Sequence, residues 1–207
     1  MDMLYRTALC HLIKVGQIGI CLLSLPAYAW VLNITPGTRA VYLAVGNATT
    51  NAANATVNQV GTTLLPANVT SGVPQPLLTS NSTQAASPYD GYTVCTPGAG
   101  QVYVGGFFRM PGASTSTAVL QVTTPAGLTS GTNTIPFSQI SWASTSIGNS
   151  SIADIPAGTF VNAGTLFLRS FAANSYIENC HTFTYANTNI VPAGNYQGQA
   201  SYTLTAP

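Results

Sequence analysis

Charged residues are scarce in this chain of 207 residues, where they make up 4% of the sequence against roughly 25% in an average soluble domain. Beyond residue 29 the only basic residues are Arg39, Arg109 and Arg169. Three scattered arginines cannot neutralise a phosphate backbone, so we expect no nucleic acid partner. The chain also lacks the high net charge that keeps many sequences disordered, and 46% of it is hydrophobic. We therefore predict a folded domain.

Groups that could perform acid–base catalysis are equally few. Beyond residue 29 the chain has three carboxylates and one histidine, namely Asp90, Asp154, Glu178 and His181. Asp90 precedes a glycine and Asp154 lies beside a Pro-Ala-Gly turn, so neither indicates a paired-carboxylate site. His181 is more simply an imidazole on a strand than a catalytic base. We predict no enzymatic activity, no cofactor and no bound metal, and an activity that depended on His181 would overturn this.

The sequence has no apolar run long enough to span a membrane. The run from Val15 to Leu25 falls short of the roughly 20 residues that a spanning helix needs. Basic residues precede it, and Ala27 and Ala29 supply the small residues of a signal-peptidase site. We therefore predict that residues 1–29 are a signal peptide, that the exported chain begins at Trp30, and that it has no transmembrane segment. An uncleaved membrane anchor is the alternative.

Cysteine is rare, and its positions favour one disulfide. Cys10 and Cys21 belong to the predicted signal peptide, which leaves Cys95 and Cys180. A pair of cysteines in an exported domain most often forms a disulfide bond. A reactive thiol or a metal site is the alternative, since His181 adjoins Cys180, but no Cys-x-x-Cys motif accompanies them.

Alternation of apolar and polar residues is the main structural signal. It predicts strands over residues 30–34, 39–45, 56–65, 92–95, 101–108, 118–124, 135–143, 165–171, 176–185 and 196–206. The loop between residues 95 and 101 favours a hairpin of its two flanking strands. Pro-Ala-Gly occurs three times, at residues 125–127, 156–158 and 192–194, and suits a turn before a new strand. We predict one all-β domain over residues 30–207, an antiparallel immunoglobulin-like β-sandwich.

The stretch at residues 194–207, GNYQGQASYTLTAP, shows the alternation most clearly. Its small or apolar positions form one face: Tyr196, Gly198, Ala200, Tyr202, Leu204 and Ala206. We expect a strand with this face in the core and with one backbone edge that another segment or another protein must cover.

This stretch resembles the C-terminus of subunits exported by the bacterial chaperone–usher pathway, with spore-coat-U-like and archaic-type pilins the nearest. In those families a glycine fourteen residues from the end precedes alternating apolar residues that a periplasmic chaperone pairs with by strand addition. Gly194 holds that position here, and Tyr196, Ala200, Tyr202 and Leu204 match the alternation. The penultimate tyrosine that is frequent in the family is replaced by Ala206, which leaves the class of chaperone open.

The resemblance implies an incomplete sandwich that a donor strand completes, first from the chaperone and then from the next subunit at an outer-membrane usher. The donor that we propose is the alternating N-terminal segment within residues 30–38, with Trp30, Leu32 and Ile34, extended by Val41, Leu43 and Val45. Ordinary first strands of a self-contained domain are the alternative. The expected function is a non-catalytic structural or adhesive subunit of a surface fimbria, built from copies of itself or related pilins. The alternative function is a self-complete secreted binding module, with glycan recognition by loops such as residues 67–87.

Overall fold

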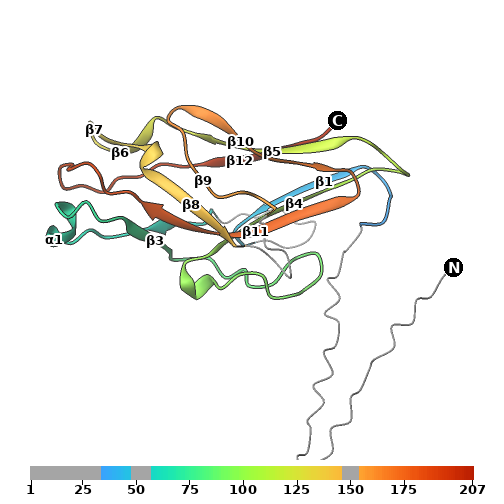
Figure 1. Ribbon diagram of the computed structural model, residues 1–207, viewed down its shortest axis with the longest axis horizontal. Helices are drawn as coiled ribbons and strands as arrows, with labels where there is room; N and C mark the ends of the chain where they lie inside the picture. Colours follow the sequence, from blue (N-terminus) through green and yellow to red (C-terminus); the bar gives the residue numbers. More distant parts are fainter. Residues whose placement is uncertain (1–33, 48–56, 146–153) are drawn as a thin grey trace, which may run out of the picture.

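Antiparallel strands in two layers make up the fold, as the sequence predicts for an all-β, sandwich-like protein (Figure 1). The computed structural model describes residues 34–47, 57–145 and 154–207. The predictions for residues 1–29, Trp30 and Leu32 lie outside the described residues. Helical structure in the described part is limited to α1 (Pro66–Val69) and two 3-10 turns, Pro97–Ala99 and Phe137–Gln139. No helix among these residues is long and apolar enough to cross a membrane.

The larger sheet is organised around its longest strand, β11 (Ser175–Tyr185). Its path runs β1 (Ala40–Val45), β4 (Val102–Arg109), β11, β3 (Gln75–Thr79) and β2 (Val60–Gly61). In addition, β8 (Ile140–Thr145) pairs with β11, and β9 (Gly158–Thr159) pairs with β8.

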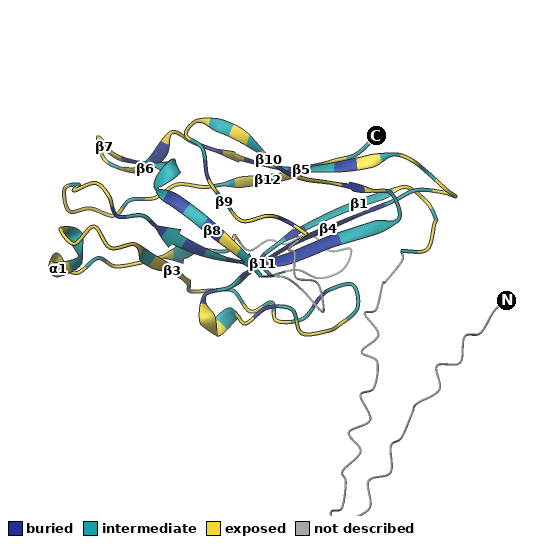
Figure 2. Ribbon diagram, viewed as in Figure 1, coloured by how far each residue is buried: buried dark blue, intermediate teal, exposed yellow. Residues whose placement is uncertain are grey.

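The smaller sheet lies across the core from the larger one (Figure 1). Its order is β10 (Gly164–Ala172), β5 (Thr117–Thr124) and β12 (Ser201–Thr205), so β5 is central. A separate hairpin joins β6 (Gly127–Ser130) to β7 (Asn133–Pro136). Figure 2 shows the deepest burial on the strands that face each other between the layers. Leu120 and Val122 of β5 are each 1% exposed, and Val104 and Phe108 of β4 are fully buried.

The central strands of the larger sheet are buried on both faces. In β11, Ile177 and Phe183 join the core between the sheets, whereas Cys180 belongs to a second, smaller cluster with Cys95 and Tyr103. Val94 and Cys95 of that cluster come from residues 82–96, which we call the cover segment. Because β11 faces a packed surface on each side, its buried positions run consecutively instead of alternating.

Several predicted strands differ in the structure. Residues 92–95 form no hairpin with β4, because Thr93 bridges Ala86 within the cover segment. Of residues 57–65 only Val60 and Gly61 are strand, and residues 135–143 are divided by a 3-10 turn. The last strand begins at Ser201 and not at Tyr196, since the chain from Gly194 to Ala200 makes only one isolated bridge, Gln197 to Thr129.

The Pro-Ala-Gly turns behave as the sequence indicates in two of three places. Gly127 opens β6 and Gly158 opens β9. The third turn, ending at Gly194, leads into the irregular stretch before β12. A turn motif therefore locates a change of direction, while pairing further along the chain decides whether a strand follows.

Candidate functional site

The edge strand β12 carries the candidate site. Its register with β5 places Tyr202 opposite Val122 and Leu204 opposite Leu120. Those two β5 residues are buried, so Tyr202 and Leu204 point inward with them, and both contact the core. They are nevertheless only half-buried, while Ser201, Thr203 and Thr205 are exposed. The predicted apolar face therefore exists over residues 202–206, but it is incompletely covered.

Leu204 reaches the opposite layer because a glycine lies beneath it. A Cβ atom built on Gly106 of β4 would lie 3.0 Å from Cδ2 of Leu204 and 3.0 Å from the carbonyl oxygen of Tyr42. Gly106 thus leaves the space that the leucine side chain fills. Gly106, the second of two neighbouring glycines in β4, therefore has a packing role on this face.

Among the described residues, Gly194, Tyr196 and Ala200 do not share the strand. Tyr196 is half-buried and its hydroxyl donates a hydrogen bond to the carbonyl oxygen of Pro192, at 2.8 Å. A Cβ on Gly194 would lie 2.5 Å from Oγ of Ser130, which lies at the end of β6. Gly194 and the neighbouring Gln197 therefore lie against the β6–β7 hairpin, and the strand that can add a partner is shorter than the sequence suggests.

The proposed donor extension at Val41, Leu43 and Val45 requires a correction. These residues form β1, which pairs with β4 of the same chain over its whole length, with Leu43 opposite Gly106. All three side chains pack against the chain's own core. They are part of the domain and not of a free donor segment. Ile34, which is half-buried, lies in no strand.

The strands β1 and β12 end their respective sheets and approach each other from opposite layers. Half-buried apolar side chains of both strands, including Leu43 and Leu204, therefore line the same side of the sandwich. Outside β12, Arg39 bridges the layers: its Nε donates to the carbonyl oxygen of Pro207 at 2.7 Å and its Nη2 to that of Ala206 at 2.8 Å.

The two outer edges of the smaller sheet differ in how they are protected. Within the described residues, neither β10 nor β12 has a strand partner on its side away from β5. The register of β10 is interrupted at Leu168 by a bulge, and Arg169 follows it. Bulges and charges on edge strands discourage addition of a further strand. β12 has neither a bulge in its register nor a charge in Ser201–Thr205.

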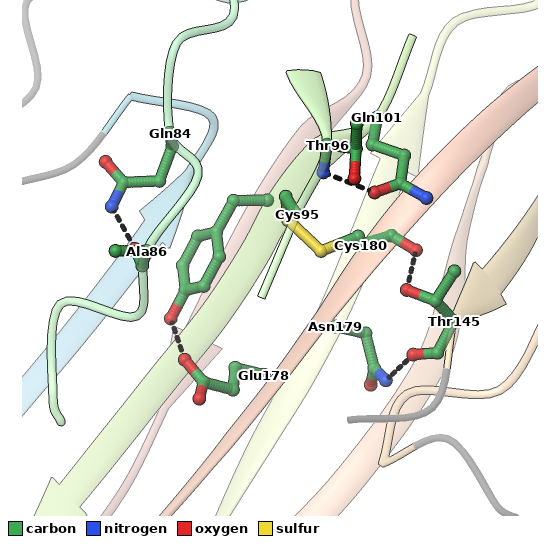
Figure 3. Close-up of a disulfide and its surroundings, with 10 residues drawn as sticks. Gln84, Ala86, Cys95, Thr96, Gln101, Thr145, Glu178, Asn179 and Cys180 are labelled. Atoms are coloured by element: carbon green, nitrogen blue, oxygen red, sulfur yellow. Dashed lines mark hydrogen bonds between the residues drawn. A yellow bond between two sulfur atoms is a disulfide. The ribbon is translucent and has the colours of Figure 1, made fainter. Parts of the chain in front are cut away.

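The predicted disulfide joins Cys95 to Cys180, with 5.5 Å between their Cα atoms (Figure 3). It fixes the cover segment to β11. On the same face of β11, the Tyr103 hydroxyl donates a 2.8 Å hydrogen bond to Oε2 of Glu178. Glu178 is 2% exposed, and burial raises the pKa of its carboxyl group in spite of this hydrogen bond.

His181 lies on the opposite face of β11 from the disulfide. Its ring stacks on Trp142 at a centroid distance of 6.0 Å and meets the edge of Phe183 at 6.1 Å. Neither ring nitrogen has a hydrogen-bond partner in the described part of the chain, and burial lowers the pKa of the ring to about 3. The imidazole is therefore neutral and sealed among aromatic rings, where no substrate reaches it. The described residues contain no cluster of three or more His, Cys, Asp or Glu side chains that could hold a metal.

No family model, curated protein or solved structure matches this chain. Sequence reasoning found the disulfide and the apolar face of β12. It missed Arg39 as the bridge to residues 206–207 and the buried Glu178, because each depends on residues far apart in the sequence. The approach of Arg39 to the end of the chain has no local signal.

Proposed function

We propose that this protein is a non-catalytic structural or adhesive subunit of a bacterial surface fimbria, exported and assembled by addition of a β-strand at the β12 edge. The observation that carries the proposal is the condition of that edge: its apolar face is partly exposed, and Ser201–Thr205 has neither a bulge nor a charge, whereas β10 has a bulge and an arginine. An extended segment that pairs with such an edge gains main-chain hydrogen bonds and buries alternate side chains.

The resemblance of residues 194–207 to chaperone–usher subunits supports the same function. It assigns a periplasmic chaperone and an outer-membrane usher as transient partners, and copies of this chain or related pilins as the lasting ones. The donor is now restricted to residues before β1. Gly37 and Thr38 are hydrogen-bonded to the end of β4 of the same chain, so the length available to the donor is that of residues 30–36. Seven extended residues span about 23 Å, whereas the five residues of β12 need about 17 Å. The segment is long enough to run along the whole edge.

The test changes the face of the donor segment without changing its length. Trp30, Leu32 and Ile34 alternate in the sequence, so replacing all three by serine should remove the side chains that fill the partner. The matched control replaces Val31 and Asn33, on the other face, by serine. We expect the first variant to be a folded monomer. We expect the control and the unmodified chain to form a ladder of oligomers that resists detergent until it is heated.

Solution mass and circular dichroism provide the readout. A folded, unmodified chain that stays monomeric at high concentration contradicts strand exchange and favours the self-complete binding module. Ladders that persist in the triple serine variant contradict the assignment of the donor.

A further inference from the structure

Arg39 is held in place by the larger sheet before its side chain reaches the smaller one. The Gly37 amide donates to the carbonyl oxygen of Met110 at 3.1 Å, and Nε of Arg109 donates to the carbonyl oxygen of Thr38 at 3.0 Å. Ala40, the next residue, pairs with Arg109 at the start of β1. The backbone that carries Arg39 is thus fastened to the end of β4.

From this anchored position the guanidinium group donates hydrogen bonds to two acceptors directly after β12. Its 2.7 and 2.8 Å hydrogen bonds go to successive carbonyl oxygens, those of Pro207 and Ala206. A rigid planar donor that holds two neighbouring carbonyl groups restrains the direction of the strand that precedes them. The side chain therefore ties the end of one layer to the beginning of the other.

We propose that Arg39 is a latch on the β12 edge, which restrains β12 against the larger sheet and slows addition of a strand there. The second part of this inference, the slower addition of a strand, rests on the proposed function. A strand added along β12 on the side toward β1 has to pass the position where the arginine side chain crosses between the layers. Addition therefore requires the two hydrogen bonds to break first, and the edge is closed for most of the time in the free subunit.

The first measurement does not depend on assembly. Arg39→Met keeps the aliphatic stem and removes the donors, and Arg169→Met makes the same change in exposed β10 of the same sheet. We expect hydrogen exchange of those β12 amides that are hydrogen-bonded to β5 to become about two- to fivefold faster in Arg39→Met, the range for an exposed charged contact. Exchange in Arg169→Met should be unchanged. Equal exchange at these amides in all three proteins overturns the latch.

The second measurement follows the binding of a fluorescent peptide that has the sequence of residues 30–38. The receiving protein is the variant in which Trp30, Leu32 and Ile34 are replaced by serine. Arg39→Met should increase the association rate by a similar factor. Binding at equal rates with and without Arg39 contradicts the latch as a barrier to addition. Faster exchange without any peptide binding leaves the restraint in place and contradicts the proposed function.

Discussion

Glu178 is the only carboxyl group that is buried in the described part of the chain. Its hydrogen-bond donor is the phenol of Tyr103, and the ring of Tyr89 packs on Tyr176 beside it, with centroids 4.8 Å apart. Burial raises the pKa of Tyr176 to about 12 as well. Because the carboxyl group is buried, the balance between its neutral and ionised forms is shifted toward the neutral form relative to a carboxyl group in water.

The raised pKa of Glu178 gives stability a definite pH dependence. Between the unfolded value of 4.5 and the higher folded value, the native state binds more protons than the unfolded state. The stability contributed by this carboxyl is therefore present below pH 4.5 and is lost as the pH rises through the folded pKa. We predict that Glu178→Gln, which is always neutral, is more stable than the unmodified protein at pH 8 and equally stable near pH 4.

Urea unfolding at pH 4, 6 and 8 measures this difference. Asp154→Asn removes an exposed carboxylate whose charge contributes to the raised pKa of Glu178, so it should change the profile in the same direction as Glu178→Gln and by less. If the Glu178→Gln variant loses stability with rising pH as steeply as the unmodified chain, another group is responsible. His181 acts in the opposite direction: its lowered pKa makes stability fall as the pH drops from 6.5 toward 3.

Alternation in the sequence locates strands well where one face is buried and the other is exposed. β5 and β10 fall within two residues of their predicted bounds; burial alternates along β5, and along β10 it alternates as far as the bulge at Leu168. Prediction fails for Tyr196–Ala200, which alternates equally well in sequence but has no neighbouring strand within reach except at Gln197. Alternation reports what a strand would bury, whereas pairing depends on where the rest of the chain places a partner.

The glycine doublet in β4 shows how one strand serves both of its faces. A Cβ atom on Gly105 would lie 2.3 Å from the Tyr103 hydroxyl, on the cover-segment face, while Gly106 accommodates Leu204 on the core face. The two neighbouring phenylalanines divide in the same way. Phe107 stacks on Tyr42 at 5.7 Å, and Phe108 is buried in the main core.

We predict that Gly105→Ala destabilises the protein by about 1–3 kcal/mol, because the new methyl group displaces the Tyr103 ring from Glu178. Gly61→Ala is the control: Gly61 is also in a strand, and a Cβ there meets nothing within 4 Å. That change should stay within about 0.5 kcal/mol. Chemical unfolding of both variants at pH 5 compares them, and a Gly105→Ala protein as stable as Gly61→Ala would show that the Tyr103–Glu178 contact tolerates the shift.

At the scale of the whole molecule, the disulfide holds a second layer of chain on the larger sheet, so that β4 and β11 are buried on both faces. Because Cys95 and Cys180 are the only cysteines beyond residue 29, their pairing could be predicted from the sequence. The segment that the disulfide holds against the sheet could not be predicted, because residues 82–96 have no strong periodicity. In the structure this segment covers the outer face of β4 and β11, with Tyr89 edge-on to Phe107 at 5.8 Å.

We predict that replacing both cysteines by alanine lowers the free energy of unfolding by about 4–5 kcal/mol, the chain-entropy value for a closed loop of 85 residues. The cover segment should open before the sandwich does, because its inner cluster is small and separate from the main core. Limited chymotrypsin digestion should then cut first after Tyr89 or Tyr92, and leave β12 intact. The unmodified protein, digested with its disulfide oxidised, is the control. Cuts distributed evenly along the double variant would mean that the disulfide holds the whole sandwich together, and that the cover segment has no separate stability.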